Sequence, residues 1–515
     1  MAEVLADVEM MESLELSDGE RSPRPPRAES ASASANDAVP LMSGAGAKSC
    51  EPQGSDGGGD NPRSSASAMK SPSVSVADAL EREQMLRQPA TPLKHLIISS
   101  VFGNMLEWYD FGVFASFSTE ISQAFFTGGR LEELLEVYGV FAVAFFARPL
   151  GGFLLGLIGD KYARTLSLQI SVVAMGVSAL VLSILPTNNV GTYKIGPPAT
   201  ILIVIVRIVQ GLSVGGEMVG SMLYMVEHVP EKWKCLVSCV PMASAVGGTA
   251  TGYLVSAIIT ALLTEDQRVL WGWRVAFALG VPAGAVGFMF RTCLSESHSF
   301  SSAIKKFAAR HQNQHPFFFA LRNAPGAMAC LTLLSMLLCG YYAATVWYLQ
   351  AWLEAFYTSL IAEEFQLSEL QGRVLNTFLL YFALAGGALV TAFFIDLKGQ
   401  NIAQHTLIGA SASLLFILSP ILLWLMSLGN RCYFCVAGGQ LGNIVVFLPT
   451  TATLALFLVA QFPPQLQYTS IALAYNVGQA AFGGTIPFIA TAMVVKNEFL
   501  LTPSFYVSGL ALMGA

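Results

Sequence analysis

The sequence predicts an all-α membrane protein, and two observations lead to this fold class. Of the 515 residues, 54% are hydrophobic and only 12% are charged, whereas soluble globular proteins carry about 25% charged residues. From residue 96 onward the chain consists of apolar runs of 18 residues or more. Each run is long enough to span about 30 Å of hydrocarbon as a helix, so most of the chain is expected to face lipid.

The first 92 residues form a tail of different composition. They are rich in Ser, Ala, Pro, Gly and acidic residues, and they carry a net charge of −7, which leaves the rest of the chain close to neutral. Such a segment cannot bury enough apolar surface to offset the entropy cost of ordering. We therefore expect a disordered tail, and it contains no apolar run typical of a secretory signal peptide.

Eleven apolar segments after the tail are predicted to cross the membrane. They are 96–120, 137–158, 165–186, 199–225, 235–263, 273–292, 326–357, 372–395, 404–427, 432–461 and 468–495. A twelfth begins near Phe505, but the residues up to Ala515 would rise only about 17 Å as a helix, too short to cross. The polar, basic loop 293–325 divides the segments into two six-helix bundles, 93–292 and 326–515, with the last helix truncated.

The charges in the loops predict how the chain is oriented. Nine Lys and Arg residues lie in loops on the same side as the tail, and six lie on the other side. Because cytoplasmic loops carry an excess of basic residues, the tail is expected in the cytosol, with the plasma membrane as the expected location.

The first membrane segment carries two carboxylates. Glu107 lies about 16 Å past the cytosolic edge, near the midplane, and Asp110 follows three positions later on the same face. A charge at this depth costs about 2.5–3.5 kcal/mol and is normally retained for a function or with a partner. Paired carboxylates in a low dielectric tend to hold a proton. We expect proton coupling here; the alternative is a structural pair with an arginine. The expected substrate pathway contains Asn104 and Tyr109 of this segment together with Arg148, Arg207, Gln210, Glu217, Tyr475, Asn476 and Gln479.

The second and fourth segments supply further charges. Gln210 and Glu217 are seven positions apart and share a helix face, and Arg207 lies about 60° round from Gln210. Arg207 could bind an anionic group or pair with a carboxylate of the first segment. Arg148, in the second segment, could pair with Glu217. Glycines around these residues would let a neighbouring helix approach closely.

A charged turn follows the second segment. Its candidate functional residues are Gly156, Asp160, Lys161 and Arg164. The turn is either a basic anchor or a cytosolic gate, in which Asp160 bonds a helix N-terminus or an arginine in one conformation only. Glu227 ends the fourth segment at the same surface. Asp396 follows the eighth segment in a similar stretch, so the two halves echo each other as in transporters built from repeats.

The eleventh segment carries neutral hydrogen-bonding side chains among glycines. Tyr475 and Gln479 are four positions apart and share a face, and Asn476 lies beside them. Such groups suit a polar ligand, and they equally suit hydrogen bonds between helices.

These segments resemble the major facilitator superfamily and, more narrowly, its metabolite:proton symporters, the group of proline/betaine and α-ketoglutarate carriers. The matches occur in the right order: Gly103 to Phe111, Ala147 to Gly152, Asp160 to Arg164, Arg207 to Glu217, Trp271 to Arg274, Glu296 to Phe300 and Phe462 to Pro487. The resemblance implies twelve helices with alternating access at a central site. It also implies Glu107 and Asp110 near the coupling path, and Asp160 with Arg164 in the cytosolic gate.

The sequence departs from the family's pattern at a few positions. Ala163 replaces a usual glycine and Thr165 a usual basic residue in the turn after the second segment. Glu296-Ser-His replaces a usual Glu-Thr-Pro. The copy of the turn in the second half keeps Asp396 but has Gln400 where an arginine is usual.

The leading functional hypothesis is a proton-coupled symporter of an organic osmolyte or carboxylate, working as a monomer in the bilayer without cofactor or nucleic acid. Arg148, Arg207 and Arg274 would suit a carboxylate, and aromatic side chains would suit a quaternary amine. A uniporter, or a non-transporting sensor on a transporter fold, are the alternatives. The sequence has no nucleotide-binding loop or nucleophile elbow, and Cys432–Cys435 lacks further metal ligands nearby, so an enzyme is not expected.

Overall fold

A computed structural model describes residues 92–126, 130–338, 369–398, 403–427, 433–483 and 509, apart from positions 189, 192, 297–299, 303, 306, 308–314, 324, 327, 331, 463 and 465. Within these residues the chain is helical, and the only β-structure is an isolated bridge between Thr187 and Lys194. The predicted tail and the predicted twelfth segment lie almost wholly outside the described residues.

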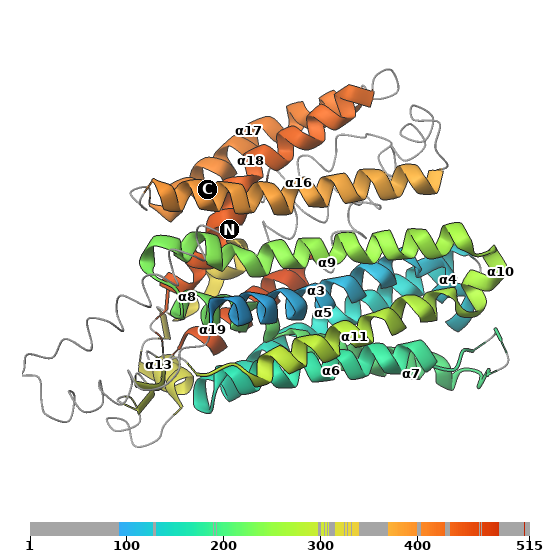
Figure 1. Ribbon diagram of the computed structural model, residues 1–515, viewed down its shortest axis with the longest axis horizontal. Coiled ribbons are helices and arrows are strands. Elements are labelled where there is room, and N and C mark those ends of the chain that lie inside the picture. Colours follow the sequence, from blue (N-terminus) through green and yellow to red (C-terminus); the bar gives the residue numbers. More distant parts are fainter. Residues whose placement is uncertain are drawn as a thin grey trace, which may run out of the picture. The chain divides into compact units, whose positions relative to one another are not determined.

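The N-terminal half contains six long helical segments, all labelled in Figure 1. They are α3 (Leu93–Ser116), α5 (Arg130–Lys161), α6 (Arg164–Ile184), α7 (Pro198–Val214) with α8 (Glu217–Glu227), α9 (Lys234–Leu262) and α11 (Trp273–Thr292). The short elements α4 (Ser118–Phe125), η1 (Glu231–Trp233), α10 (Glu265–Gln267) and η2 (Arg268–Gly272) connect them. The predicted segment 199–225 is interrupted, because Gly215 and Gly216 separate α7 from α8.

The C-terminal half is described in part. Its helices are α16 (Glu369–Leu397), α17 (Gln404–Ser427), α18 (Tyr433–Ala460) and α19 (Gln467–Gly478), which continues as the π-helical turn η4 (Gln479–Gly483). The short helix α13 (Pro316–Asn323) precedes them, within the predicted loop 293–325. The seventh predicted segment is seen only at its start, where Met328–Leu338 is bent 115° from Phe317–Asn323. The remainder of that segment and of the eleventh lies outside the described residues.

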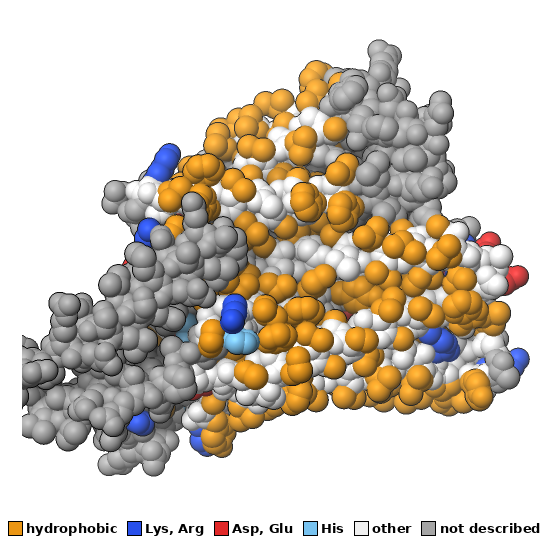
Figure 2. Space-filling model, viewed as in Figure 1, with side chains coloured by type: hydrophobic (Ala, Val, Ile, Leu, Met, Phe, Trp, Pro, Cys, Tyr) orange, Lys and Arg blue, Asp and Glu red, His pale blue; other side chains and the backbone are white. Residues whose placement is uncertain are grey.

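The helices have the length and surface of membrane spans. In the described part of the chain, eight helices are long and apolar enough to cross a membrane, and the bent pair would make a ninth. Large apolar side chains such as Leu150, Val177, Ile201 and Phe382 are exposed along them, and Figure 2 shows such side chains along the flanks of the helices. A surface of this kind is suited to lipid.

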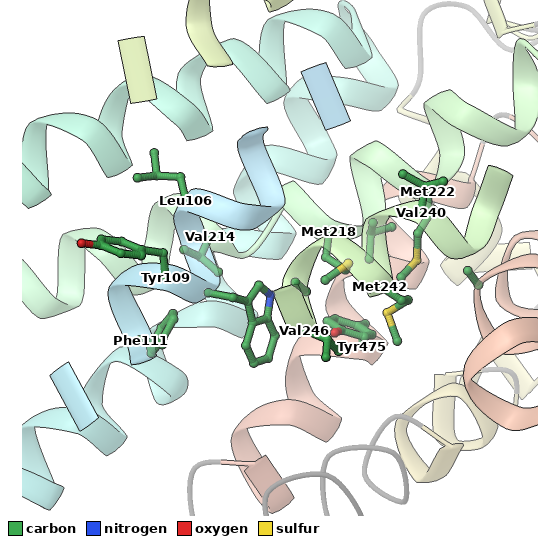
Figure 3. Packing of buried hydrophobic residues seen from close by; sticks show 14 of the residues in the cluster. Leu106, Tyr109, Phe111, Val214, Met218, Met222, Val240, Met242, Val246 and Tyr475 are labelled. Atoms are coloured by element: carbon green, nitrogen blue, oxygen red, sulfur yellow. The ribbon is translucent and has the colours of Figure 1, made fainter. Parts of the chain in front are cut away.

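Close backbone contacts hold α3 against α9, and glycine permits them. A Cβ added to Gly248 would lie 2.9 Å from the Cα of Met105, and one added to Gly112 would lie 2.9 Å from the carbonyl oxygen of Thr249. Small residues of this kind let membrane helices approach closely. Buried apolar side chains fill the space beside this contact, among them Leu106, Val246 and Met242 (Figure 3). The packing fixes the polar side chains of α3 in the interior of the half.

Candidate functional site

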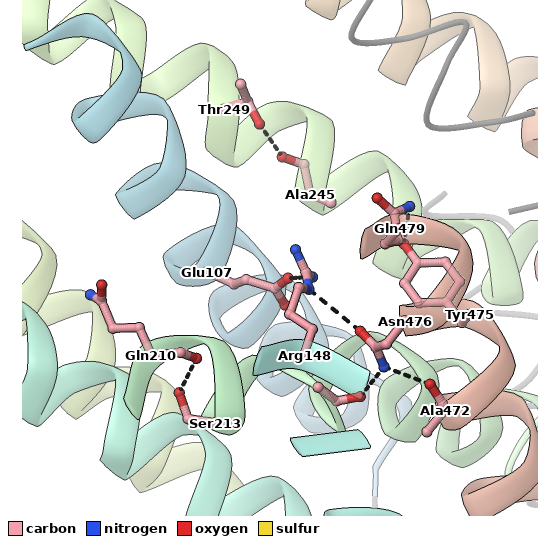
Figure 4. A network of polar contacts seen from close by, with 11 residues as sticks. Glu107, Arg148, Gln210, Ser213, Ala245, Thr249, Ala472, Tyr475, Asn476 and Gln479 are labelled. Atoms are coloured by element: carbon pink, nitrogen blue, oxygen red, sulfur yellow. Dashed lines mark hydrogen bonds and ion pairs between the residues drawn. The ribbon is translucent and has the colours of Figure 1, made fainter. Parts of the chain in front are cut away.

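Glu107, Arg148 and Asn476 form the central polar contact. The Glu107 carboxylate on α3 pairs with the Arg148 guanidinium on α5, and both side chains are fully buried. The Nε of Arg148 also donates to Oδ1 of Asn476 on α19 at 3.4 Å. Figure 4 shows the three side chains in line. A predicted carboxylate of the first segment, an arginine of the second and an amide of the eleventh therefore meet, and they join the two halves.

The surroundings of Arg148 are aromatic. Its guanidinium carbon lies 5.4 Å from the ring centre of Trp108, 5.3 Å from that of Phe111 and 5.1 Å from that of Phe145. Aromatic faces stabilise a cation that has lost its water. One oxygen of Glu107 (Oε2) and one nitrogen of Arg148 (Nη1) have no hydrogen-bond partner among the described residues. The pair therefore keeps one acceptor and one donor for a proton or a ligand.

Asp110 forms a second buried pair. Its Oδ2 accepts from Nη1 of Arg207 at 2.8 Å and from Nε2 of Gln210 at 3.1 Å. Arg207 also donates to Oε1 of Gln210 at 2.8 Å and lies 3.6 Å from the ring centre of Phe114. Of the partners left open for Arg207, the structure selects Asp110. Both carboxylates of α3 thus have an arginine partner, as the structural alternative foresaw.

Glu217 pairs with Arg291 at the end of α11, and the pairing with Arg148 that the sequence allowed is wrong. Nη1 of Arg291 donates to Oε2 of Glu217 at 2.7 Å and to the Leu168 carbonyl oxygen at 2.6 Å. The break at Gly215–Gly216 has a physical consequence here, because it makes Glu217 the first residue of α8. Its carboxylate is then separated from the Gln210 cluster that was expected to share its face, and a helix start favours a negative charge.

The remaining predicted pathway residues do not all join this cluster. Tyr109 donates to the Ala276 carbonyl oxygen at 2.6 Å, and Asn104 donates to the Ser100 carbonyl oxygen in its own helix at 2.9 Å. Gln479 donates to the hydroxyl of Tyr475 at 3.3 Å, close to Asn476 (Figure 4). Arg274 contacts the Ser183 carbonyl oxygen and the Trp273 ring. Tyr475 and Gln479 thus lie close to the central contact. The side chains of Asn104, Tyr109 and Arg274 bond groups within the N-terminal half.

The predicted gate residues meet at one end of the helices, which we call the Asp160 end and define by Asp160, Arg164 and Glu227. Oδ2 of Asp160 accepts from the backbone N–H of Thr469 at 2.8 Å and from its hydroxyl at 2.6 Å. Arg164 pairs with Glu227 and donates to the Pro464 carbonyl oxygen at 2.9 Å. Asp160 thereby caps the N-terminus of α19, where a negative charge is favourable, and these contacts close this end between the halves.

Asp396 makes the reciprocal contact from the second half. Its carboxylate accepts from the backbone N–H of Leu236 at 2.7 Å and from that of Cys235 at 3.3 Å. Both N–H groups lie in the first turn of α9. Although the arginine of the motif is absent at Gln400, which lies outside the described residues, the aspartate still caps a helix of the opposite half.

The two remaining predicted gate residues, Gly156 and Lys161, have different roles. A Cβ added to Gly156 would lie 2.6 Å from the Cα of Thr469, so glycine lets α19 lie against α5. Lys161 is exposed, and its ammonium lies over the Tyr162 ring at 5.1 Å. It therefore suits the anchoring role rather than a contact between halves.

The structure also identifies residues that the sequence reasoning did not single out. Arg291 could have been suspected as an arginine within the last turn of an apolar segment. Tyr468 donates to the Gly216 carbonyl oxygen at 2.8 Å and bonds Ser167 at 3.0 Å, contacts that no local signal indicates. Thr165, at a departure from the motif, donates from its N–H and hydroxyl to Glu296 at 3.2 and 3.1 Å. Within the described residues, no three His, Cys, Asp or Glu side chains gather as metal ligands.

The known proteins that are similar to this chain are described as transporters. The family model described as "Sugar (and other) transporter" matches residues 96–314. The glycine betaine/proline/ectoine/pipecolic acid transporter OusA of Dickeya dadantii is 27% identical over 82% of this chain and 82% of its own length. The proline/betaine transporter of Escherichia coli is 26% identical, with the same two coverages.

Solved structures with the same fold include the proton:xylose symporter XylE of the major facilitator superfamily, bound to 6-bromo-6-deoxy-D-glucose. It has a TM-score of 0.64 at 14% identity and covers 82% of this chain and 94% of its own. A partially occluded, inward-open form of XylE from E. coli has a TM-score of 0.60. At this identity the likeness concerns the fold.

Proposed function

We propose that this chain is a transporter of the major facilitator superfamily and that it moves a small carboxylate-bearing osmolyte together with a proton. The OusA and E. coli relatives are named as transporters of betaine and proline, which are small zwitterions with one carboxylate. The observation that carries the proposal is the buried Glu107–Arg148 pair at the contact between the halves.

The charge balance of this pair would couple the binding of the proton to the binding of the substrate. Protonation of Glu107 leaves the Arg148 cation buried without a counter-ion, and an uncompensated buried charge costs several kcal/mol, on the order of 3–5. A substrate carboxylate at the unused Nη1 of Arg148 restores the balance. The same carboxylate, arriving while Glu107 is ionised, would add a surplus negative charge. Proton and substrate therefore bind favourably together and unfavourably alone, which is the requirement for symport.

The Asp110–Arg207 pair supports the same assignment. It is equally buried, and Oδ1 of Asp110 has no hydrogen-bond partner among the described residues. Gln210 stabilises the carboxylate with a second donor. We assign Asp110 a secondary part in coupling, because its pair does not reach the second half as the Glu107 pair does.

The orientation and location belong to the proposal too. The excess of basic residues in the loops on the tail's side favours a cytosolic Asp160 end. The plasma membrane is the proposed location, and a single copy of the chain contains the whole set of residues argued here. The central loop and tail are proposed as cytosolic segments.

The test is uptake into liposomes that contain the purified protein. With an inward proton gradient, uptake is measured for labelled betaine, proline, α-ketoglutarate, citrate and a hexose. We expect gradient-driven accumulation of betaine or proline, abolished by Glu107→Gln and lowered about tenfold or more by Asp110→Asn. The matched control is Glu265→Gln, since Glu265 is an exposed carboxylate.

Three other results would contradict the proposal. Uptake that ignores the gradient and survives Glu107→Gln would identify a uniporter. Accumulation of the hexose alone would exclude a carboxylate as the recognised group. No uptake of any compound by folded, correctly inserted protein would favour a sensor on a transporter fold.

A further inference from the structure

Asn476 contacts both parts of the machinery at once. Its Oδ1 accepts from Nε of Arg148, which is also the partner of Glu107. Its Nδ2 donates to the Gly215 carbonyl oxygen at 2.6 Å and to the Ala472 carbonyl oxygen at 2.6 Å. The side chain is 1% exposed. One amide of the C-terminal half therefore binds the proton-coupled pair and the interrupted fourth segment of the N-terminal half.

The break between α7 and α8 provides the carbonyl group that Asn476 uses. A helix interruption leaves backbone carbonyls without their usual N–H partners. Tyr468, two turns earlier in α19, donates to the adjacent Gly216 carbonyl oxygen, which also accepts from the N–H of Gly220. The halves are thus joined along α19 by neutral hydrogen bonds, in addition to the charged contacts of Asp160 and Arg164.

The chemistry of the position requires an amide. Arg148 needs an acceptor, and the Gly215 carbonyl needs a donor. An amide supplies both groups from one side chain. An aliphatic residue would supply neither group and would leave a buried donor and acceptor unpaired.

We propose that Asn476 is a positioning residue that makes the opening of the Asp160 end depend on the state of the Glu107–Arg148 pair; this rests on the proposed function. While Glu107 is ionised, it holds the Arg148 guanidinium in place, and Arg148 in turn holds Asn476 and α19. When Glu107 is protonated and a substrate carboxylate draws Arg148 away, Asn476 loses its donor and α19 is free to leave the break. Without both ligands the end stays closed, and the proton does not leak.

A native cysteine reports whether the Asp160 end is open. Cys235 is 1% exposed at the start of α9, and its thiol contacts the Ala452 carbonyl oxygen of α18 in the opposite half. Separation of the halves would expose it. Cys293 is exposed already and serves as the internal reference. The ratio of N-ethylmaleimide labelling at these two thiols, measured by mass spectrometry, gives the degree of opening.

The variants are Asn476→Ala, Glu107→Gln, their combination and Ser470→Ala. Ser470 lies on the same helix, and its hydroxyl has no hydrogen-bond partner among the described residues, so it is the matched control. We expect Asn476→Ala to label Cys235 about tenfold faster than the wild type without betaine or a proton gradient. Ser470→Ala should label at the wild-type rate. Glu107→Gln mimics the protonated carboxylate, so it should accelerate labelling only when betaine is present, and it should then add little to Asn476→Ala, because both act through Arg148.

Measurements of betaine flux in proteoliposomes distinguish a failure of this inference from a failure of the proposed function. Asn476→Ala should let betaine flow down its own gradient without protons while accumulation is lost, a change that simple loss of protein would not produce. Wild-type labelling rates in Asn476→Ala, or additive effects of Asn476→Ala and Glu107→Gln, would overturn the inference while leaving symport intact. Absence of uptake by the wild type would overturn the function, whereas the ligand-free labelling comparison would still decide whether Asn476 holds the end closed.

Discussion

At the scale of single residues, the charged side chains could be predicted but their partners could not. Apolar flanking sequence placed Glu107, Asp110 and Arg207 inside the membrane. Glu107, Asp110 and Glu217 pair with arginines that lie 41, 97 and 74 positions away in the chain. Helix periodicity gives the face of a residue and says nothing about which helix that face meets. The Glu217–Arg148 pair, which the sequence allowed and the structure contradicts, shows this limit of helix periodicity.

The Glu217–Arg291 pair gives a prediction about stability. Both side chains are at most 2% exposed, so Glu217→Gln leaves a buried arginine cation without its counter-ion. Removing one partner of a buried pair costs about 3–5 kcal/mol, and we expect a clear drop in the thermal unfolding temperature in detergent. Glu231→Gln is the control, because Glu231 pairs with Lys234 at the surface and such pairs contribute little. Unchanged stability of Glu217→Gln would show that the pair has no structural role.

At the scale of elements, the helices were predictable and their irregularities were not. Most of the long apolar segments appear within a few residues of their expected limits where they are described, and α5 begins seven residues before the expected start at 137. The glycines of the fourth segment were visible in the sequence, yet glycine permits both close packing and a break. Only the neighbouring α19, whose Asn476 donates to the Gly215 carbonyl oxygen at the break, shows why the interrupted form is stable.

The docking of α13 depends on a neutral histidine. His315 precedes this helix, and its Nδ1 accepts from the Phe317 N–H at 3.3 Å while Nε2 donates to the Leu157 carbonyl oxygen at 3.2 Å. Protonation would place a second donor against the Phe317 N–H at a helix N-terminus, where a cation is unfavourable. Burial and, to a lesser degree, the Lys161 charge lower the pKa of His315 below its ordinary value of 6.5, although the bond to Leu157 raises it in part.

This pKa shift predicts a weaker docking of α13 in acid. The docked state disfavours the proton, so docking keeps its full stability above about pH 6.5 and loses it as the pH falls below that value. Amide hydrogen exchange of residues 317–323, corrected for intrinsic rates, should therefore be faster at about pH 5.5 than at about pH 7.5. His315→Gln retains a donor for Leu157 without titrating, and its exchange should not depend on pH in this way. Equal protection of the wild type at both pH values would argue against a docking role for the bond from the Phe317 N–H to neutral His315.

At the scale of the whole molecule, the two halves close the Asp160 end by equivalent contacts. Asp160 of the first half caps α19 of the second, and Asp396 of the second caps α9 of the first. In both cases the third residue of the helix donates its N–H. The sequence repeat indicated that these two aspartates correspond, but it could not show that each binds the opposite half, because that depends on how the halves face each other.

We therefore predict that Asp160→Asn and Asp396→Asn each open the Asp160 end. Each change removes a charge at a helix N-terminus and weakens a charge-assisted hydrogen bond worth roughly 1.5–3 kcal/mol. Labelling of Cys235 relative to Cys293 should rise in each variant and rise about multiplicatively in the double variant, because separate sites contribute independently. A variant of Asp396 that labels like the wild type would mean that only the first copy of the turn holds the end closed.

The neutral pairing of Glu107 with Arg148 also has an electrical consequence. Because the unloaded Glu107–Arg148 pair is neutral, the return of the unloaded carrier moves no charge at this pair. The current per cycle is then set by the cargo alone. A zwitterion with one proton would carry one positive charge inward, and a membrane potential of about 100 mV would contribute about 2.3 kcal/mol to its accumulation. A simple monocarboxylate with one proton would cross without current and would gain nothing from that potential.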